Sequence, residues 1–193
     1  DHTSGLTELI TGGRITVRNL LMPDISFQDT SYDLLVTLAE EQDIKVSFIK
    51  AGDVLQDGKV KITCLHPSTD YPARSSNAYS TVLSVSYLEF DMLLTGDLEM
   101  DGERRVMELL KKQDGISAAV DYDILKVAHH GSKSSTGQGL LTLTQPEYAI
   151  ISCGKGNRYG HPNTETLERL KQACSKTLIT YESGAITIHT DGE

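Results

Sequence analysis

The chain has 193 residues, of which 38% are hydrophobic and 23% are charged, and it has no tryptophan. This is the composition of one ordinary globular domain, and it excludes fibrous and disordered proteins. The net charge of −9 argues against a uniformly nucleic-acid-binding surface, and three widely spaced cysteines without a CxxC pair exclude both a disulfide scaffold and a four-thiolate zinc site.

Hydrophobic periodicity predicts the elements of the first half of the chain. A helix is expected over residues 32–41 and a strand over 44–49. The Asp57-Gly58 turn is followed by alternating residues that predict a strand over 60–64. Two further strands, 81–87 and 92–95, are expected to join through a tight turn at 89–91. An amphipathic helix over 99–112 follows them.

The second half alternates strands with helices in the same way. Strands are predicted over 124–128 and 148–153, and Pro162 is expected to open a helix over 163–174. Two closing strands, 177–180 and 185–189, flank Ser183-Gly184. Helices interspersed among buried strands predict an α/β layered fold in a single domain over 1–193.

The charge is distributed unevenly along the chain. Residues 124–181 hold seven Lys or Arg and three Asp or Glu, a net charge of +4, which leaves −13 for the remainder. Such a split is typical of a face that meets an anionic partner, and chance clustering of solvated charges explains it equally well. No apolar run approaches the roughly 18–20 residues of a membrane helix, and the first residues do not resemble a signal peptide.

Residues of the types that bind metals gather at five places, each beside a predicted strand or at a chain end. These are Asp1-His2, Asn77, the Gly-Asp pair ending at Asp97, the pair His129-His130, and the loop Asn157-Arg158-Tyr159-Gly160-His161. A carboxylate at a strand end can bridge two cations, and imidazole nitrogen suits zinc, manganese or iron. Two bridged cations would hold a hydroxide and a phosphate oxygen together.

Each of these signals also has an ordinary structural interpretation. Gly-Asp after a strand is typical of a turn or a helix cap, and Asn77 alone is typical of a turn. Asn157 and His161 can form a turn and a cap. The adjacent histidines are less ordinary, because successive strand residues face opposite ways and at most one would point into a core.

In combination and in this order, the segments DH, N, TGDLE, LKVAHHGSKSS and NRYGHP resemble the C-terminal metallo-β-lactamase-like domain of the ComEC-type DNA-internalisation competence proteins. The resemblance covers nearly the whole chain. It implies a four-layer αββα sandwich with a metal site at one edge. It also implies a metal-dependent hydrolase of phosphodiesters that degrades the DNA strand not taken up.

The resemblance also implies a role for each candidate residue. Asp1 and His2 match the end of the first metal motif, Asn77 the third-motif position, Asp97 the bridging carboxylate, and either His129 or His130 the last histidine ligand. His161 would protonate or hydrogen-bond the leaving oxygen, with Asp1 and Asp97 completing the catalytic set. Four residues would face the substrate: Ser132, Lys133, Asn157 and Arg158. The implied cofactors are two divalent ions, Mn²⁺ or Zn²⁺.

Two departures from the family pattern shape these expectations. The chain begins at Asp1, so the preceding motif residues and the opening strands of the sandwich are expected to be missing, and with them some metal ligands. The third motif offers Asn77, a weaker ligand than histidine. His66 is a rival for that position, although a turn or packing role suits a residue that precedes Pro67.

The expected partners are DNA, in single-stranded form, and the membrane channel that forms the rest of the parent polypeptide. The expected location is therefore an aqueous, extracytoplasmic compartment beside a bacterial membrane. Two other functions remain open, because fold does not decide function. One is hydrolysis of a small phosphodiester on the same fold. The other is a metal-free inactive or docking module.

Overall fold

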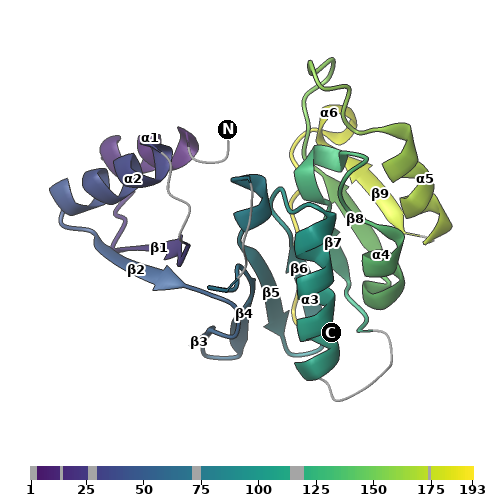
Figure 1. Ribbon diagram of the computed structural model, residues 1–193, viewed down its shortest axis with the longest axis horizontal. Coiled ribbons are helices and arrows are strands. Elements are labelled where there is room, and N and C mark those ends of the chain that lie inside the picture. The colour runs from purple at the N-terminus through teal and green to yellow at the C-terminus, as the bar shows by residue number, and fades with distance from the viewer. Residues whose placement is uncertain (1–3, 14, 26–29, 71–74, 114–119, 174) are drawn as a thin grey trace.

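The computed structural model describes residues 4–13, 15–25, 30–70, 75–113, 120–173 and 175–193. These residues form two sheets with helices packed against them (Figure 1), which confirms the α/β class. No helix in this described part of the chain is both long enough and apolar enough to cross a membrane.

A small N-terminal unit stands apart from the large sheet in Figure 1. It consists of α1 (Ser4–Thr11), β1 (Asn19–Pro23), α2 (Thr30–Glu41) and β2 (Lys45–Ile49), and β1 pairs with β2 in parallel. Its own buried cluster includes Leu20, Met22, Leu35 and Ala39. The helix predicted over 32–41 and the strand predicted over 44–49 are confirmed here.

The remaining strands form one mixed sheet in the order β3-β4-β5-β6-β7-β8-β9. Pairing is antiparallel from β3 to β6 and parallel from β6 to β9. The strands are β3 (Val54–Asp57), β4 (Val60–His66), β5 (Val82–Tyr87), β6 (Phe90–Leu94), β7 (Ile124–Lys126), β8 (Tyr148–Ile151) and β9 (Lys176–Ile179). Because β6 to β9 are parallel, their carboxyl ends meet along one edge.

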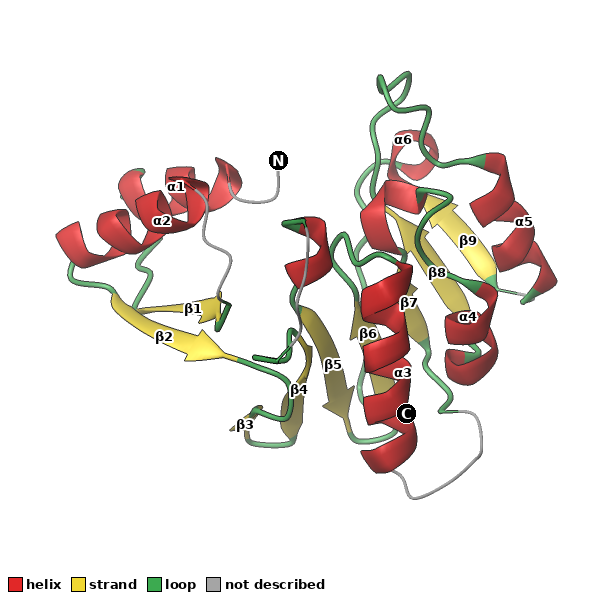
Figure 2. Cartoon of the chain, in the orientation of Figure 1, coloured by secondary structure: helices red, strands yellow, loops and turns green. Residues whose placement is uncertain are grey.

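Helices α3 (Met100–Gln113), α4 (Gln138–Thr144) and α5 (Thr164–Gln172) cover one face of this sheet (Figure 2). The strands alternate, so every second residue faces the helices. Leu93, Leu125, Ala149 and Ile151 therefore lie in the main core, each completely buried. The inward face of α3 is also there, with Val106 and Leu110 almost fully buried, whereas Leu109 is only partly buried.

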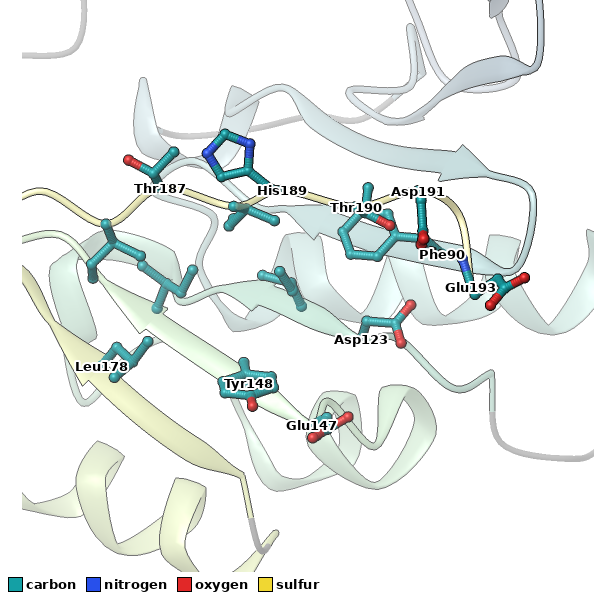
Figure 3. Close-up of a pocket in the computed structure, with 14 residues that line it drawn as sticks. Phe90, Asp123, Glu147, Tyr148, Leu178, Thr187, His189, Thr190, Asp191 and Glu193 are labelled. Carbon is teal, nitrogen blue, oxygen red and sulfur yellow. Dashed lines mark hydrogen bonds between the residues drawn. The ribbon is translucent and has the colours of Figure 1, made fainter.

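The opposite face of the sheet is covered differently. Register places Met92, Ile124, Ile150 and Leu178 on it. An extended C-terminal segment, residues 186–191, runs along this face and lines one side of an open cavity of about 740 Å³ (Figure 3). One helix layer and one large sheet are thus described, and the four-layer sandwich stays a prediction.

Several sequence predictions need correction. The strand predicted over 185–189 is wrong: these residues are extended but join no strand among the described residues. Instead, the short helix α6 (Thr180–Ser183) follows β9. Pro162 does not open α5, because Asn163 is the N-cap of that helix. The turn between β5 and β6 lies at Leu88-Glu89, one residue earlier than expected. The helices α1 and α4 and the strands β1 and β3 were not predicted.

Candidate functional site

The candidate site lies where the carboxyl ends of three parallel strands meet. Asp97 follows β6, the pair His129-His130 follows β7, and His161 ends the loop that follows β8. Loops at the carboxyl edge of parallel strands are the usual place for a ligand, since the chain reverses there and leaves side chains exposed. Asp97 and His161, 64 residues apart in the sequence, interact electrostatically at this edge.

The turn after β6 fixes Asp97 in a buried position. Gly96 takes a left-handed conformation, with φ +52°. A β-carbon there would lie 3.0 Å from the β-carbon of Ser80. The backbone N–H of Asp97 donates to the hydroxyl of Ser80 over 3.0 Å. The residue is only 8% exposed, so its carboxylate is held in place by both local backbone geometry and a neighbouring loop.

The twin histidines lie in a strained turn, the 3-10 segment η2 (Ala128–Gly131). His129 has φ 48° and ψ 45°, and His130 has φ 55° and ψ 21°. Left-handed backbone costs a residue with a β-carbon about 1–2 kcal/mol, so two in succession persist only when their surroundings enforce them. One enforcing contact is the N–H of His129, which donates to the carbonyl of Gly96 over 3.0 Å.

His130 faces Asp97 with an oriented ring. Its Nδ1 lies 2.7 Å from the backbone carbonyl of Ser152, and a carbonyl accepts only from a protonated nitrogen. In a neutral ring, Nε2 is then left with its lone pair. That Nε2 is 3.7 Å from Oδ2 of Asp97. A histidine tied to a carbonyl through one nitrogen, with the other beside a carboxylate, is the usual arrangement of a metal-ligating imidazole.

His129 and His161 form a second pair at the same edge. Their ring centroids are 5.5 Å apart at 77°, and Nδ1 of His129 is 4.0 Å from Oε1 of Glu99. Burial, helped by the two neighbouring histidines, lowers the pKa of His161 below its ordinary value of 6.5, while Asp97 opposes the shift. The His161 ring is therefore neutral at pH 7.

A positive charge lies beneath the site. Lys126, the last residue of β7, is half-buried and its Nζ donates to the carbonyl of Val127 over 2.8 Å. Burial lowers the pKa of this ammonium, and the nearby Asp97 carboxylate opposes that shift. A cation behind the carboxylate offsets part of the negative charge collected at this edge.

The site has the donor chemistry of a metal centre: one buried carboxylate, two histidines that approach carboxylates, and a third histidine beside them. Among the described residues, however, no three His, Cys, Asp or Glu side chains form a group that could hold an ion by themselves. Asp1 and His2, which were predicted to complete the ligand set, lie outside the described residues.

Asn77 is the half-buried first residue of the 3-10 segment η1 (Asn77–Tyr79). This segment leads to Ser80, which holds Asp97. His66 is fully buried and its Nε2 lies 2.7 Å from the carbonyl of Ala78, which agrees with a packing role that fixes η1. Burial lowers the pKa of His66, with the nearby Arg105 acting in the same direction.

The four predicted substrate-facing residues lie on two adjacent loops and differ in exposure. Lys133 and Arg158 are exposed, whereas Ser132 is 7% exposed and its hydroxyl lies 3.0 Å from that of Ser134. Asn157 organises its own loop: its Oδ1 accepts from the N–H of His161 over 3.0 Å, and its Nδ2 donates to the carbonyl of Gly154, also over 3.0 Å.

Sequence reasoning missed the two residues that hold the loop after η2. Glu103, 3% exposed, accepts from the N–H groups of Thr136 and Gly137. Burial raises its pKa, and these hydrogen bonds and Arg169 oppose the shift. Arg169 donates to the carbonyls of Lys133, Ser135 and Thr136. A signal existed for Glu103, since it lies three residues before Val106 and seven before Leu110 on the inward face of α3.

Comparison with known proteins agrees with the sequence motifs. The chain is 35% identical over 170 residues to ComE operon protein 3 of Bacillus subtilis (strain 168), an alignment that covers 88% of this chain and 21% of that protein. It is 35% identical over 116 residues to Recombination protein 2 of Haemophilus influenzae, covering 60% of this chain and 14% of that protein. It is 36% identical over 110 residues to Competence protein ComA of Neisseria gonorrhoeae, covering 57% of this chain and 15% of that protein.

These alignments confirm the expected resemblance to ComEC-type competence proteins. The chain spans between 14% and 21% of the length of these three relatives. No protein-family model matches the chain.

Proposed function

We propose that this chain, a homologue of one part of the ComEC-type competence proteins, is a metal-dependent phosphodiesterase that degrades DNA during DNA uptake. The observation that supports the proposal most is the meeting of Asp97, His129, His130 and His161 at one sheet edge. The names of two relatives, Recombination protein 2 and Competence protein ComA, refer to recombination and competence, which agrees with a DNA substrate.

Asp97 and His130 are the residues best placed to hold a divalent ion, Mn²⁺ or Zn²⁺. Nε2 of His130 and Oδ2 of Asp97 converge to 3.7 Å, a separation that suits neighbouring ligands of one ion. In the proposal, His129, Asn77, Asp1 and His2 supply the further ligands for two ions. Such ions supply Lewis-acid chemistry, polarising the phosphoryl group and making water more acidic.

The remaining residues of the site act on the substrate directly. Lys133 and Arg158 are exposed cations on the two neighbouring loops, placed to bind phosphate oxygens and offset negative charge that develops during the reaction. His161, neutral at pH 7, donates a hydrogen bond to the leaving oxygen rather than a full proton. The buried Ser132 and the amide of Gly131 orient a nonbridging oxygen.

The finer features of the fold belong to the same proposal. The sheet face opposite α3, α4 and α5 holds half-exposed apolar residues, Met92, Ile150 and Leu178 among them. A second sheet packed on this face would bury them and complete a four-layer αββα sandwich. The domain would then act beside a membrane channel formed by the rest of a longer polypeptide, on its extracytoplasmic side.

The proposal is tested with Asp97→Asn, compared with the exposed Asp121→Asn as a control. Bound metal is measured by elemental analysis, and hydrolysis is measured on single-stranded DNA with Mn²⁺ and with Zn²⁺. We expect Asp97→Asn to lose at least a hundredfold in rate and most of its metal while its thermal melting stays cooperative. Normal hydrolysis by Asp97→Asn would refute the assignment.

A second candidate is favoured by the net charge of −9, which disfavours a polyanion over a small substrate. This candidate function is hydrolysis of a small phosphodiester. Assaying a chromogenic aryl phosphodiester beside DNA distinguishes it from DNA degradation. Cleavage of the small ester alone would favour it. An absence of both metal and cleavage would instead favour an inactive or docking module.

A further inference from the structure

An aromatic ring projects from the loop between β8 and α5. Tyr159 is 63% exposed, more than any other large apolar or aromatic side chain in the described part of the chain. Single exposed apolar side chains are normal at protein surfaces and need no explanation by themselves. What the ring contacts, and where the loop places it, are therefore the informative observations.

The ring is held in a fixed orientation. It stacks on His161, with ring centroids 5.7 Å apart and planes at 25°. The guanidinium of Arg158 lies over it, 4.7 Å from the centroid, and bonds its hydroxyl. The backbone N–H of Tyr159 donates to Oδ1 of Asn157 over 3.2 Å. Asn157 thus fixes the loop from which both planar groups project.

This stack leads directly into the candidate site. His161, under Tyr159, meets His129 edge-to-face at 5.5 Å, and His129 adjoins His130 at 6.3 Å. Planar groups therefore form a continuous row from the solvent-exposed guanidinium of Arg158 to the two histidines after β7. A ligand bound at the outer end of this row would be adjacent to the reacting group at its inner end.

The chemistry of the outer end selects one kind of ligand. A flat aromatic ring beside a planar cation stacks well on a nucleobase, and base-on-aromatic stacking is tolerant of sequence. The bases of a duplex already stack on one another, so only an unpaired base is available. The exposed Lys133 lies on the adjacent loop, and its backbone N–H donates to Oδ1 of Asn163 over 2.9 Å. Its side chain offers a positive charge to the phosphates on either side of the stacked base.

We propose that Tyr159 and Arg158 form a base-stacking subsite for an unpaired nucleotide of single-stranded nucleic acid, next to the bond to be cleaved. The subsite rests on the proposed function for its position beside the reacting phosphate. It also makes a separate prediction, because base stacking requires no catalysis and no bound metal.

The test compares two labelled hexanucleotides, one of adenines and one with the same backbone but without bases. Binding is measured by fluorescence anisotropy in the presence of a chelator, so that neither is cleaved. We expect the unmodified chain and Tyr159→Phe to bind the adenine strand about tenfold more tightly than the abasic strand. Tyr159→Leu should lose this preference. Tyr181→Leu, which removes a 37% exposed ring outside the stack, should keep it.

Equal affinity of the unmodified chain for both strands, or no measurable binding of either, would overturn the subsite. A base preference that survives in Tyr159→Leu would overturn it as well. The outcome is independent of the hydrolysis assay. If the chain prefers the adenine strand but cleaves no phosphodiester, the subsite is supported and the proposed function is refuted. If the chain cleaves DNA but shows no preference for the adenine strand, the proposed function is supported and the subsite is refuted.

Discussion

Replacing Glu103 with alanine tests whether the loop after the twin histidines is held from the helix layer. The carboxylate is 3% exposed and accepts hydrogen bonds from two backbone N–H groups, those of Thr136 and Gly137. No other acceptor for either group is present in the described part of the structure. Truncation therefore leaves two buried donors without partners.

The expected loss of stability follows from these contacts. A hydrogen bond to a charged group contributes about 1.5–3 kcal/mol, and an orphaned buried donor costs about 1–3 kcal/mol. Relief of the desolvation of the buried carboxylate, which raises its pKa, offsets part of the loss. We expect a net destabilisation of about 3 kcal/mol, which in a chain of this size lowers the melting temperature by roughly 6–12 °C.

The assay is thermal and urea unfolding of Glu103→Ala beside Glu108→Ala. Glu108 lies on the exposed side of the same helix, so its loss should cost about 0.5 kcal/mol or less. If the two variants unfold within about 0.5 kcal/mol of each other, Glu103 does not hold the loop and the reasoning fails. Glu103→Gln, which keeps one acceptor oxygen, should fall between the two.

Two further predictions concern the same region. Gly131 has φ +83°, and a β-carbon there would lie 2.6 Å from that of Pro162. Gly131→Ala should therefore lower the free energy of unfolding by at least about 2 kcal/mol, measured in urea. The control is Gly154→Ala, whose added β-carbon would meet nothing within 4 Å, and equal stability of the two variants would contradict the strain argument. Because burial lowers the pKa of His66 below 6.5, its stabilisation is complete above pH 6.5 and is lost as the pH falls through the lowered value. The unmodified chain should thus lose more stability than His66→Gln between pH 7.5 and 5.5, and parallel losses in urea unfolding would show that His66 does not titrate this way.

Local sequence patterns predicted those elements whose pattern matches their final environment. The helix at 32–41, the helix at 99–112 and most strands of the large sheet bury one face, so their periodicity is visible in the sequence, whereas β3, exposed along its length, carries no such pattern. Residues 185–189 alternate like a strand, yet a strand also needs hydrogen-bonded neighbours. None is supplied among the described residues, and the sequence pattern alone does not reveal this.

The sequence predicted which residues form the candidate site but not the contacts that hold those residues in place. Asp97, His129, His130 and His161 stood out because they follow strands. The contacts that hold them come from other segments: the carbonyl of Ser152 accepts from the ring of His130, and the hydroxyl of Ser80 accepts from the N–H of Asp97. Tyr159 lay within a candidate motif, but its stacking on His161 depends on a loop conformation that no sequence rule provides.

The left-handed pair at His129 and His130 has a consequence for transplanting this chemistry. A short peptide with the sequence AHHG would relax to an ordinary backbone, because the shape here depends on the carbonyl of Gly96, which accepts from the N–H of His129, and on the following loop, which Glu103 and Arg169 hold from two helices. Grafting the two histidines onto another scaffold would therefore also require groups that make the contacts of Gly96, Glu103 and Arg169.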